Sequence, residues 1–274
     1  MRRTVVPIVA TLVIVAVAAP AAAYKVLVED AALGKHRKVR LDASVGAGKF
    51  YLDGAAPAGK LYKVKVVHDE KVVPAVRMAG SRLKLSSRQQ GMFGGARKNE
   101  WEVHLSSRPV WDIELGMGAS KGLLDLSGLR VRELDLETGA SQLDIVWKKR
   151  NPVTLERARV QGGAAQVKMR GLGYSNVKKI EFEGGAGSFS LDFSGGLAGT
   201  ARVKVQTGAG AVDIKVPKDV GIRVVDRNIA LAQVEWPADL EWDSPPETSN
   251  YKKARGKIDL DITAAIGRVS IKRI

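Results

Sequence analysis

The sequence contains no cysteine and only three histidines among its 274 residues. The lack of cysteine excludes disulfide bonds, thiolate metal sites, a cysteine nucleophile and lipid attachment to a cysteine after a leader segment. The histidines (His36, His68 and His104) do not have the spacing of metal ligands. No Gly-x-Ser-x-Gly sequence is present to position a serine nucleophile. The sequence therefore predicts a non-enzymatic protein with no catalytic, cofactor or metal site.

Long apolar runs are also scarce, and the only one stands at the N-terminus. Arg2 and Arg3 precede an apolar run over residues 5–18, and three alanines at 21–23 resemble a cleavage site. This layout predicts a signal peptide over residues 1–23, and hence an exported protein that is secreted or held in the cell envelope. Because residues 5–23 are uncharged, a single N-terminal membrane anchor is the alternative interpretation.

Acidic residues are outnumbered, with 29 Asp and Glu against 44 Lys and Arg, so the formal net charge is +15. Such an excess favours anionic partners, which for an exported protein are wall polymers or lipid head groups rather than nucleic acid. An envelope protein is a further candidate partner. The alternative is that the basic clusters at residues 35–40, 148–150 and 252–257 are solvated edges that keep the sheet ends soluble. The sequence gives no expectation of oligomeric state.

Glycine, in contrast, is abundant and recurs in a fixed phrase. Between residues 118 and 208 a Gly-Ala pair followed by an alternating strand appears five times, at intervals of 21, 24, 22 and 23 residues. The pairs begin at Gly118, Gly139, Gly163, Gly185 and Gly208, with an earlier copy at Gly46 and a degenerate one at residues 265–267. A period near 22 predicts stacked, nearly identical turns, each with a bend at the Gly-Ala pair.

The residues before each bend align as well. Four positions before it stand Asp42, Glu114, Asp135, Arg159, Glu181, Lys204 and Asp261, all charged, and the positions on either side of these are apolar. This alternation is typical of a half-buried strand. Stacking places equivalent residues over one another, so Asp135, Arg159, Glu181 and Lys204 should form a ladder of alternating sign. We therefore predict an all-β fold, a parallel β-solenoid (β-helix-like), with a more irregular N-terminal β region and an undetermined number of strands per turn.

Aspartates follow the bends and suggest one remote enzymatic alternative. Asp125, Asp144, Asp192 and Asp213 are expected on one outward ladder with Lys168 among them. Stacked carboxylates could serve a polysaccharide-active enzyme as an acid/base pair. A solvated polar face is the favoured interpretation, and calcium is not expected because the known calcium-loop sequences are missing.

The repeat is interrupted over residues 226–257, an insert within the second half of the chain. It carries prolines and aromatic residues, and its candidate partner-binding residues are Trp236, Trp242, Tyr251, Lys252 and Lys253. Aromatic side chains beside lysines suit a protein contact. The alternative interpretation is a loop that caps the end of the stack.

The blocks Trp101–Leu105, Trp111–Ala119, Leu124–Leu129 and Leu134–Ser141 resemble the toast-rack family of bacterial envelope proteins. The later Gly-Ala-Gly turns, residues 216–224 and the strand at 267–271 are similar to the LiaF-like (cell wall-active antibiotic response) domain. The resemblance divides the mature chain into residues 24–150 and 151–274. It implies a non-enzymatic envelope protein, sometimes one that restrains a membrane sensor kinase during cell-wall stress. A structural or adhesive surface spacer is the alternative function. No functional residue is carried over, because the shared positions are bends and core.

Overall fold

The computed structural model describes residues 13–14, 24–90 and 98–274. The predicted signal peptide therefore lies outside the described residues, except for Val13–Ile14 (β1), which pairs with the first long strand. Within the described ranges no helix is long and apolar enough to cross a membrane.

The described residues form one 17-stranded sheet and a single 3₁₀ turn, η1, at Leu172–Ser175. The longest strands are β3 (Lys38–Asp53), β8 (Val110–Asp125), β11 (Arg157–Arg170), β12 (Lys179–Asp192), β13 (Gly199–Val216), β14 (Val220–Glu235) and β17 (Gly256–Arg273). The shorter strands after β1 are β2 (Lys25–Ala32), β4 (Lys60–His68), β5 (Val72–Ala79), β6 (Arg82–Gln89), β7 (Asn99–Leu105), β9 (Arg130–Thr138), β10 (Gln142–Val146), β15 (Leu240–Glu241) and β16 (Glu247–Thr248). The all-β prediction is confirmed.

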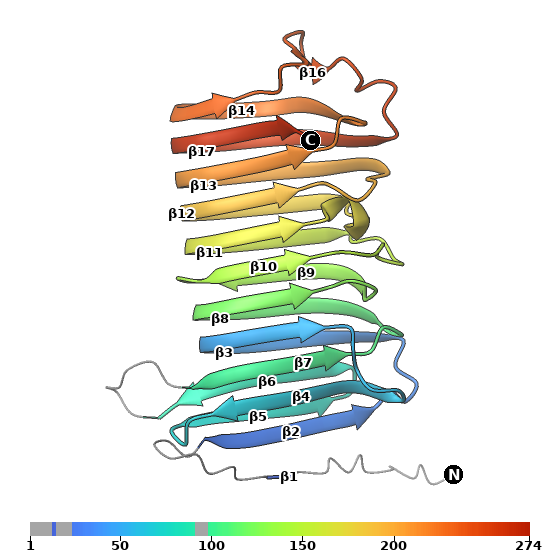
Figure 1. The fold of residues 1–274 in the computed structure, drawn as a ribbon, viewed down its shortest axis with the longest axis vertical. Helices are drawn as coiled ribbons and strands as arrows, with labels where there is room; N and C mark the ends of the chain where they lie inside the picture. Colours follow the sequence, from blue (N-terminus) through green and yellow to red (C-terminus); the bar gives the residue numbers. More distant parts are fainter. Residues whose placement is uncertain (1–12, 15–23, 91–97) are drawn as a thin grey trace.

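The long strands are bent, so that their two halves lie in two layers (Figure 1). In β3, β8, β11, β12 and β13 the Gly-Ala pair lies within the strand, whereas β14 has no such pair and β17 has only the degenerate copy. In β12 the bend is at Gly185, because pairing with β13 runs over residues 179–184 and resumes at 186–192. The apolar side chains of the two halves meet between the layers: the rings of Phe182 and Phe189 have centroids 4.2 Å apart. We call each bent strand a rung, and the pairs β9 with β10 and β6 with β7 each supply the two halves of one rung.

Parallel pairing joins the rungs in the order β3, β8, β9/β10, β11, β12, β13, β17 and β14 (Figure 1). The last strand of the chain, β17, is thus inserted between β13 and β14, which leaves β14 as the terminal rung. At the other end the sheet becomes antiparallel, in the pairs β2–β4, β4–β7 and β5–β6. The sheet is therefore mixed, and its irregular part is the N-terminal one.

The core lies between the two layers and is built from the alternating apolar positions of both halves. Trp101, Trp111 and Trp147 are fully buried there, together with Phe50 and Phe193. Since the chain has neither disulfides nor a described metal cluster, this continuous apolar interior provides the main stabilisation of the stack.

The predicted charged column before the bends is in register throughout. The observed partners are Asp42 with Glu114, Glu114 with Asp135, Asp135 with Arg159, Arg159 with Glu181, Glu181 with Lys204, and Lys204 with Asp261. The ion pairs themselves run between columns, since Glu181 is 2.5 Å from Lys179 and Arg159 is 3.9 Å from Glu183. The strand register determines which backbone positions are neighbours. The long charged side chains form their ion pairs with residues of the adjacent column.

Candidate functional site

The predicted aspartate ladder is wrong, because its members fall into two columns. Pairing places Asp125 opposite Val146, Asp144 opposite Leu123 and Lys168, Asp192 opposite Lys215, and Asp213 opposite Ser190. The two columns lie two residues apart on the same outward face. The alternation of apolar and polar residues cannot distinguish two positions that are two residues apart, because side chains at both positions point to the same face of the strand. Asp125 and Asp144 instead pair with Lys148 (2.7 Å) and Arg170 (3.3 Å).

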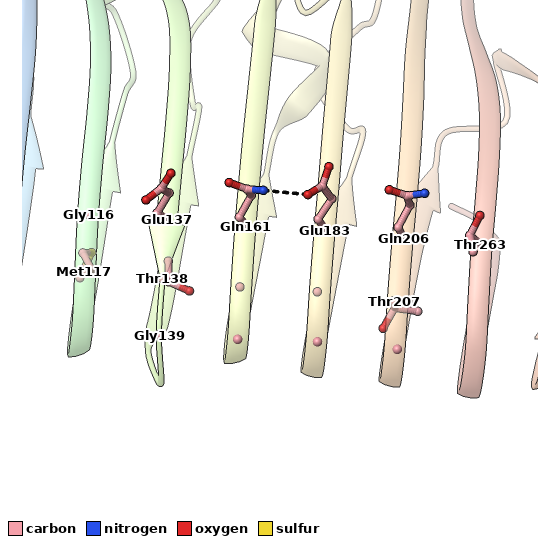
Figure 2. A pocket seen from close by; sticks show the side chains of 15 residues that line it. Gly116, Met117, Glu137, Thr138, Gly139, Gln161, Glu183, Gln206, Thr207 and Thr263 are labelled. Atoms are coloured by element: carbon pink, nitrogen blue, oxygen red, sulfur yellow. Dashed lines mark hydrogen bonds between the residues drawn. The ribbon is translucent and has the colours of Figure 1, made fainter.

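An open polar groove of about 870 Å³ runs across the rungs beside the bends. One polar side chain per rung projects along it from the position two residues before the bend (Figure 2). These side chains are Glu137, Gln161, Glu183, Gln206 and Thr263, and the pairing of β9, β11, β12, β13 and β17 aligns them. Glycines at and before the bends leave the groove floor open.

The groove offers hydrogen-bonding groups. Gln161 Nε2 donates to Glu183 Oε2 at 2.7 Å, which orders the centre of the row (Figure 2). Glu137 is exposed and Glu183 is half-exposed. Our sequence reading missed this column, although the alignment that identified the charged column two positions earlier contains it.

A second surface is distinguished by its charge. Residues 71–99 contain seven Lys and Arg and no Asp or Glu. Four of these cations project outward from β5 and β6 and are exposed: Arg77, Arg82, Lys84 and Arg88. We call these four side chains the basic face. None of them forms an ion pair with a carboxylate of the described residues.

Like charges lie directly opposite one another on the basic face. Arg77 of β5 is the cross-strand partner of Lys84 of β6, and Arg82 is the partner of Arg40 of β3. Such pairs destabilise a sheet, whereas opposite charges in these positions stabilise it. Like charges also face one another elsewhere in the stack, as in Lys179 opposite Arg202, so the basic face is distinguished by the number of its cations that form no ion pair among the described residues.

The neighbouring rung β8 neutralises two further cations near the basic face. Arg40 hydrogen-bonds Glu114 of β8, and Lys38 Nζ lies 3.0 Å from Asp112 Oδ2. Burial alone raises the pKa of Asp112, but hydrogen bonds from Arg132 and Lys38 outweigh it and lower the pKa below 3.8. The carboxylates of β8 are thus engaged by β3 and β9. The strand pairing places one acidic residue, Asp42 of β3, directly opposite Lys84 of β6.

The predicted partner-binding loop separates into two clusters. Trp236 and Trp242 meet edge to face, with ring centroids 5.6 Å apart, and the Arg227 guanidinium lies 4.8 Å from the Trp242 ring centroid. Trp242 is exposed and Trp236 packs partly against the core. Residues 226–235 of the predicted insert form the second part of β14, because its prolines begin only at Pro237.

The other three predicted residues of this loop lie apart from the tryptophans. Tyr251 is buried, and its hydroxyl donates to Asp259 Oδ1 at 2.6 Å. Burial, together with this hydrogen bond, raises the pKa of Tyr251 to about 12. Lys252 and Lys253 are exposed, and Lys252 Nζ is 3.6 Å from Glu247. Tyr251 therefore has a structural place in the end of the stack, and only the tryptophan pair presents an aromatic surface.

Residues 22–170, more than half of the chain, match the family described as the N-terminal domain of toast_rack, DUF2154. The chain belongs to the toast-rack family. The predicted resemblance is thereby confirmed. The toast-rack match includes the whole basic face and only the first rungs of the polar groove.

Solved structures similar to this toast-rack protein are distant. A Clostridium sporogenes protein whose name proposes a role in cell adhesion is 19% identical, with 92% of this chain and 100% of that chain covered and a TM-score of 0.47. A Bacteroides fragilis protein named as a candidate adhesin is 12% identical, with coverage of 91% and 97% and a TM-score of 0.41. No curated protein matches the chain in sequence.

Proposed function

We propose that this toast-rack protein is an exported, non-enzymatic component of the bacterial cell envelope that binds an anionic envelope component. The observation that carries the proposal is the basic face, where Arg77 lies opposite Lys84 and neither forms an ion pair among the described residues. A counter-ion supplied by a ligand would relieve this repulsion, so binding would stabilise the protein where its own fold does not. A part in the envelope stress response fits such a protein.

The parallel rungs support the finer fold proposal of a β-solenoid, in which the Gly-Ala bends are structural. The enzymatic alternative loses its motivation, since the aspartates do not form the predicted ladder and the carboxyls of the polar groove are not buried. Neither the positions of the aspartates nor the exposure of the groove carboxyls needs a substrate to explain it.

Binding of the full chain to anionic probes tests the proposal. We expect saturable binding at low salt to at least one of two probes, a teichoic acid polymer or vesicles containing phosphatidylglycerol. Binding should be lost near 0.5 M salt, where the Debye length falls to about 4 Å. Absence of binding to both probes at low salt would reject the proposed function.

A structural or adhesive spacer is the second candidate, and the free edge of the terminal rung favours it. On β14, Leu231 is 78% exposed, and its neighbour on β17, Ile266, is 56% exposed. In the inner rungs the same position after the bend holds alanine, as in Ala164, Ala186 and Ala209. Large exposed apolar side chains at a sheet edge are typical of contact surfaces.

A further inference from the structure

We propose that the basic face binds the surface of an anionic phospholipid bilayer, with the N-terminal end of the stack lying against the head groups. This inference rests on the proposed function and names its ligand. Two features of the described residues carry it: the apolar side chains among the cations and the basic loop beside β6.

On the basic face the cations alternate with small groups that are mostly apolar, although Ser86 stands between Lys84 and Arg88 and Asp42 of β3 lies opposite Lys84. Opposite Arg88 of β6 stands Val73 of β5, which is 44% exposed, and opposite Arg82 stands Ala79. An outward row of this kind places charges at the level of lipid phosphates and lets short apolar side chains approach the boundary with the acyl chains. A soluble polymer would draw no advantage from the exposed valine.

A loop extends the same charged area. Residues 35–38 (Lys-His-Arg-Lys) lie against the β5–β6 turn, where the Ser81 carbonyl accepts from the Arg40 N–H at 2.9 Å and Ser81 Oγ lies 3.5 Å from His36 Nδ1. Lys35 and Arg37 are exposed beside the turn. Near anionic lipids each added Lys or Arg strengthens attraction. Lys35 and Arg37 together with the basic face make six cations, within the range of about four to eight that is typical of polybasic membrane-binding segments.

A quadruple variant of the full chain tests the inference: Arg77→Gln, Arg82→Gln, Lys84→Gln and Arg88→Gln. The matched control removes the same charge from the opposite layer, by Lys121→Gln, Lys168→Gln, Lys215→Gln and Lys272→Gln, all exposed lysines. We measure partition into vesicles of phosphatidylcholine with phosphatidylglycerol and into vesicles of phosphatidylcholine alone. The ratio of the two isolates the charge-dependent part from any binding by the apolar N-terminus.

We expect the ratio of the two partition coefficients to fall by more than about tenfold in the basic-face variant and by less than about threefold in the control. The reason is that electrostatic attraction to the lipids falls off within a Debye length. Equal losses in both variants would overturn the inference. So would tighter binding of the wild-type chain to teichoic acid than to anionic vesicles, a result that leaves the proposed function standing. The variant should also unfold at an equal or higher urea concentration than the wild type, because like-charge pairs have been removed; a marked loss of stability would show that the four cations are structural.

Discussion

Two glycines shape the bend of β12 by different physical means. Gly185 permits close stacking, since a Cβ there would lie 2.9 Å from the carbonyl oxygen of Gly163 on the rung below. Gly187 has φ of +148°, which side chains disfavour, and a Cβ there would lie 2.0 Å from the carbonyl oxygen of Ala165. The recurrence of glycine at the bends thus reflects both backbone conformation and the spacing between rungs.

Gly187→Ala should therefore destabilise the protein by about 3 kcal/mol, from backbone strain and the clash with the neighbouring rung. Urea unfolding followed by circular dichroism measures the effect. Gly46→Ala is the matched control, because a Cβ at Gly46 meets no atom within 4 Å, and its change should stay below about 1 kcal/mol. Equal effects of the two substitutions would contradict this account of the bend.

Asp112 links three successive elements through its carboxylate. It lies on β8, accepts from Arg132 of β9 at 2.8 and 2.9 Å, and pairs with Lys38 of β3. Because its folded pKa is lowered, its contribution is fully present above the unfolded value near 3.8 and is lost as the pH falls through the folded value. The interactions of the Asp112 carboxylate therefore stabilise the folded protein mainly above about pH 4.

Asp112→Asn should lower the free energy of unfolding by about 1–2 kcal/mol at pH 7, since the charge-assisted hydrogen bonds are weakened. The difference from wild type should shrink as the pH falls below 3.8, where the wild-type carboxyl becomes protonated. Urea unfolding at pH 7, 5 and 3 measures it. Arg132→Gln should show the same trend, and a difference that stays constant with pH would disprove the assigned cause.

The sequence pattern predicted elements better than their connections. The columns around Asp135, Arg159 and Glu181 were correct because each is anchored to a bend a fixed number of residues away. The aspartate ladder failed because it was anchored to Leu-Asp-Leu triplets, which lie at two different distances from the bend. The antiparallel pairs at the N-terminal end and the place of β17 could not be predicted, since alternation is identical in parallel and antiparallel strands and records no strand order.

The candidate surfaces were predictable to different degrees. The tryptophan pair stays a predicted partner-binding surface, whereas Tyr251 could not be recognised as buried from its aromatic neighbours alone. The basic face was hidden from our reading because its cations are spread over residues 77–88 and only the β5–β6 pairing brings them together. Counting charges along the sequence finds cations that are close in sequence. Cations that only strand pairing brings together are found from the register of the sheet.

At the scale of the whole molecule the two ends of the stack differ in kind. The N-terminal end carries the basic face, and the free edge of its β5 is interrupted by Pro74 and Arg77. The C-terminal end carries the exposed Leu231 and Ile266, and residues 226–235 of β14 contain no proline, although Arg227 and two acidic residues lie among them. Proline and charged side chains are the usual means of protecting a sheet edge. The two ends therefore differ in the chemistry that they offer to a partner.

Leu231→Lys decides whether the protein is an adhesive spacer. If copies associate through the β14 end, the lysine should abolish concentration-dependent association in sedimentation velocity, because it places a charge in the contact and protects the edge. Leu231 is 78% exposed, so the folded monomer should keep its urea midpoint. Leu123→Lys is the control, on an inner rung at 40% exposure, and should leave association intact. A wild-type chain that stays monomeric at all concentrations would remove the adhesive candidate and leave binding by the basic face as the function.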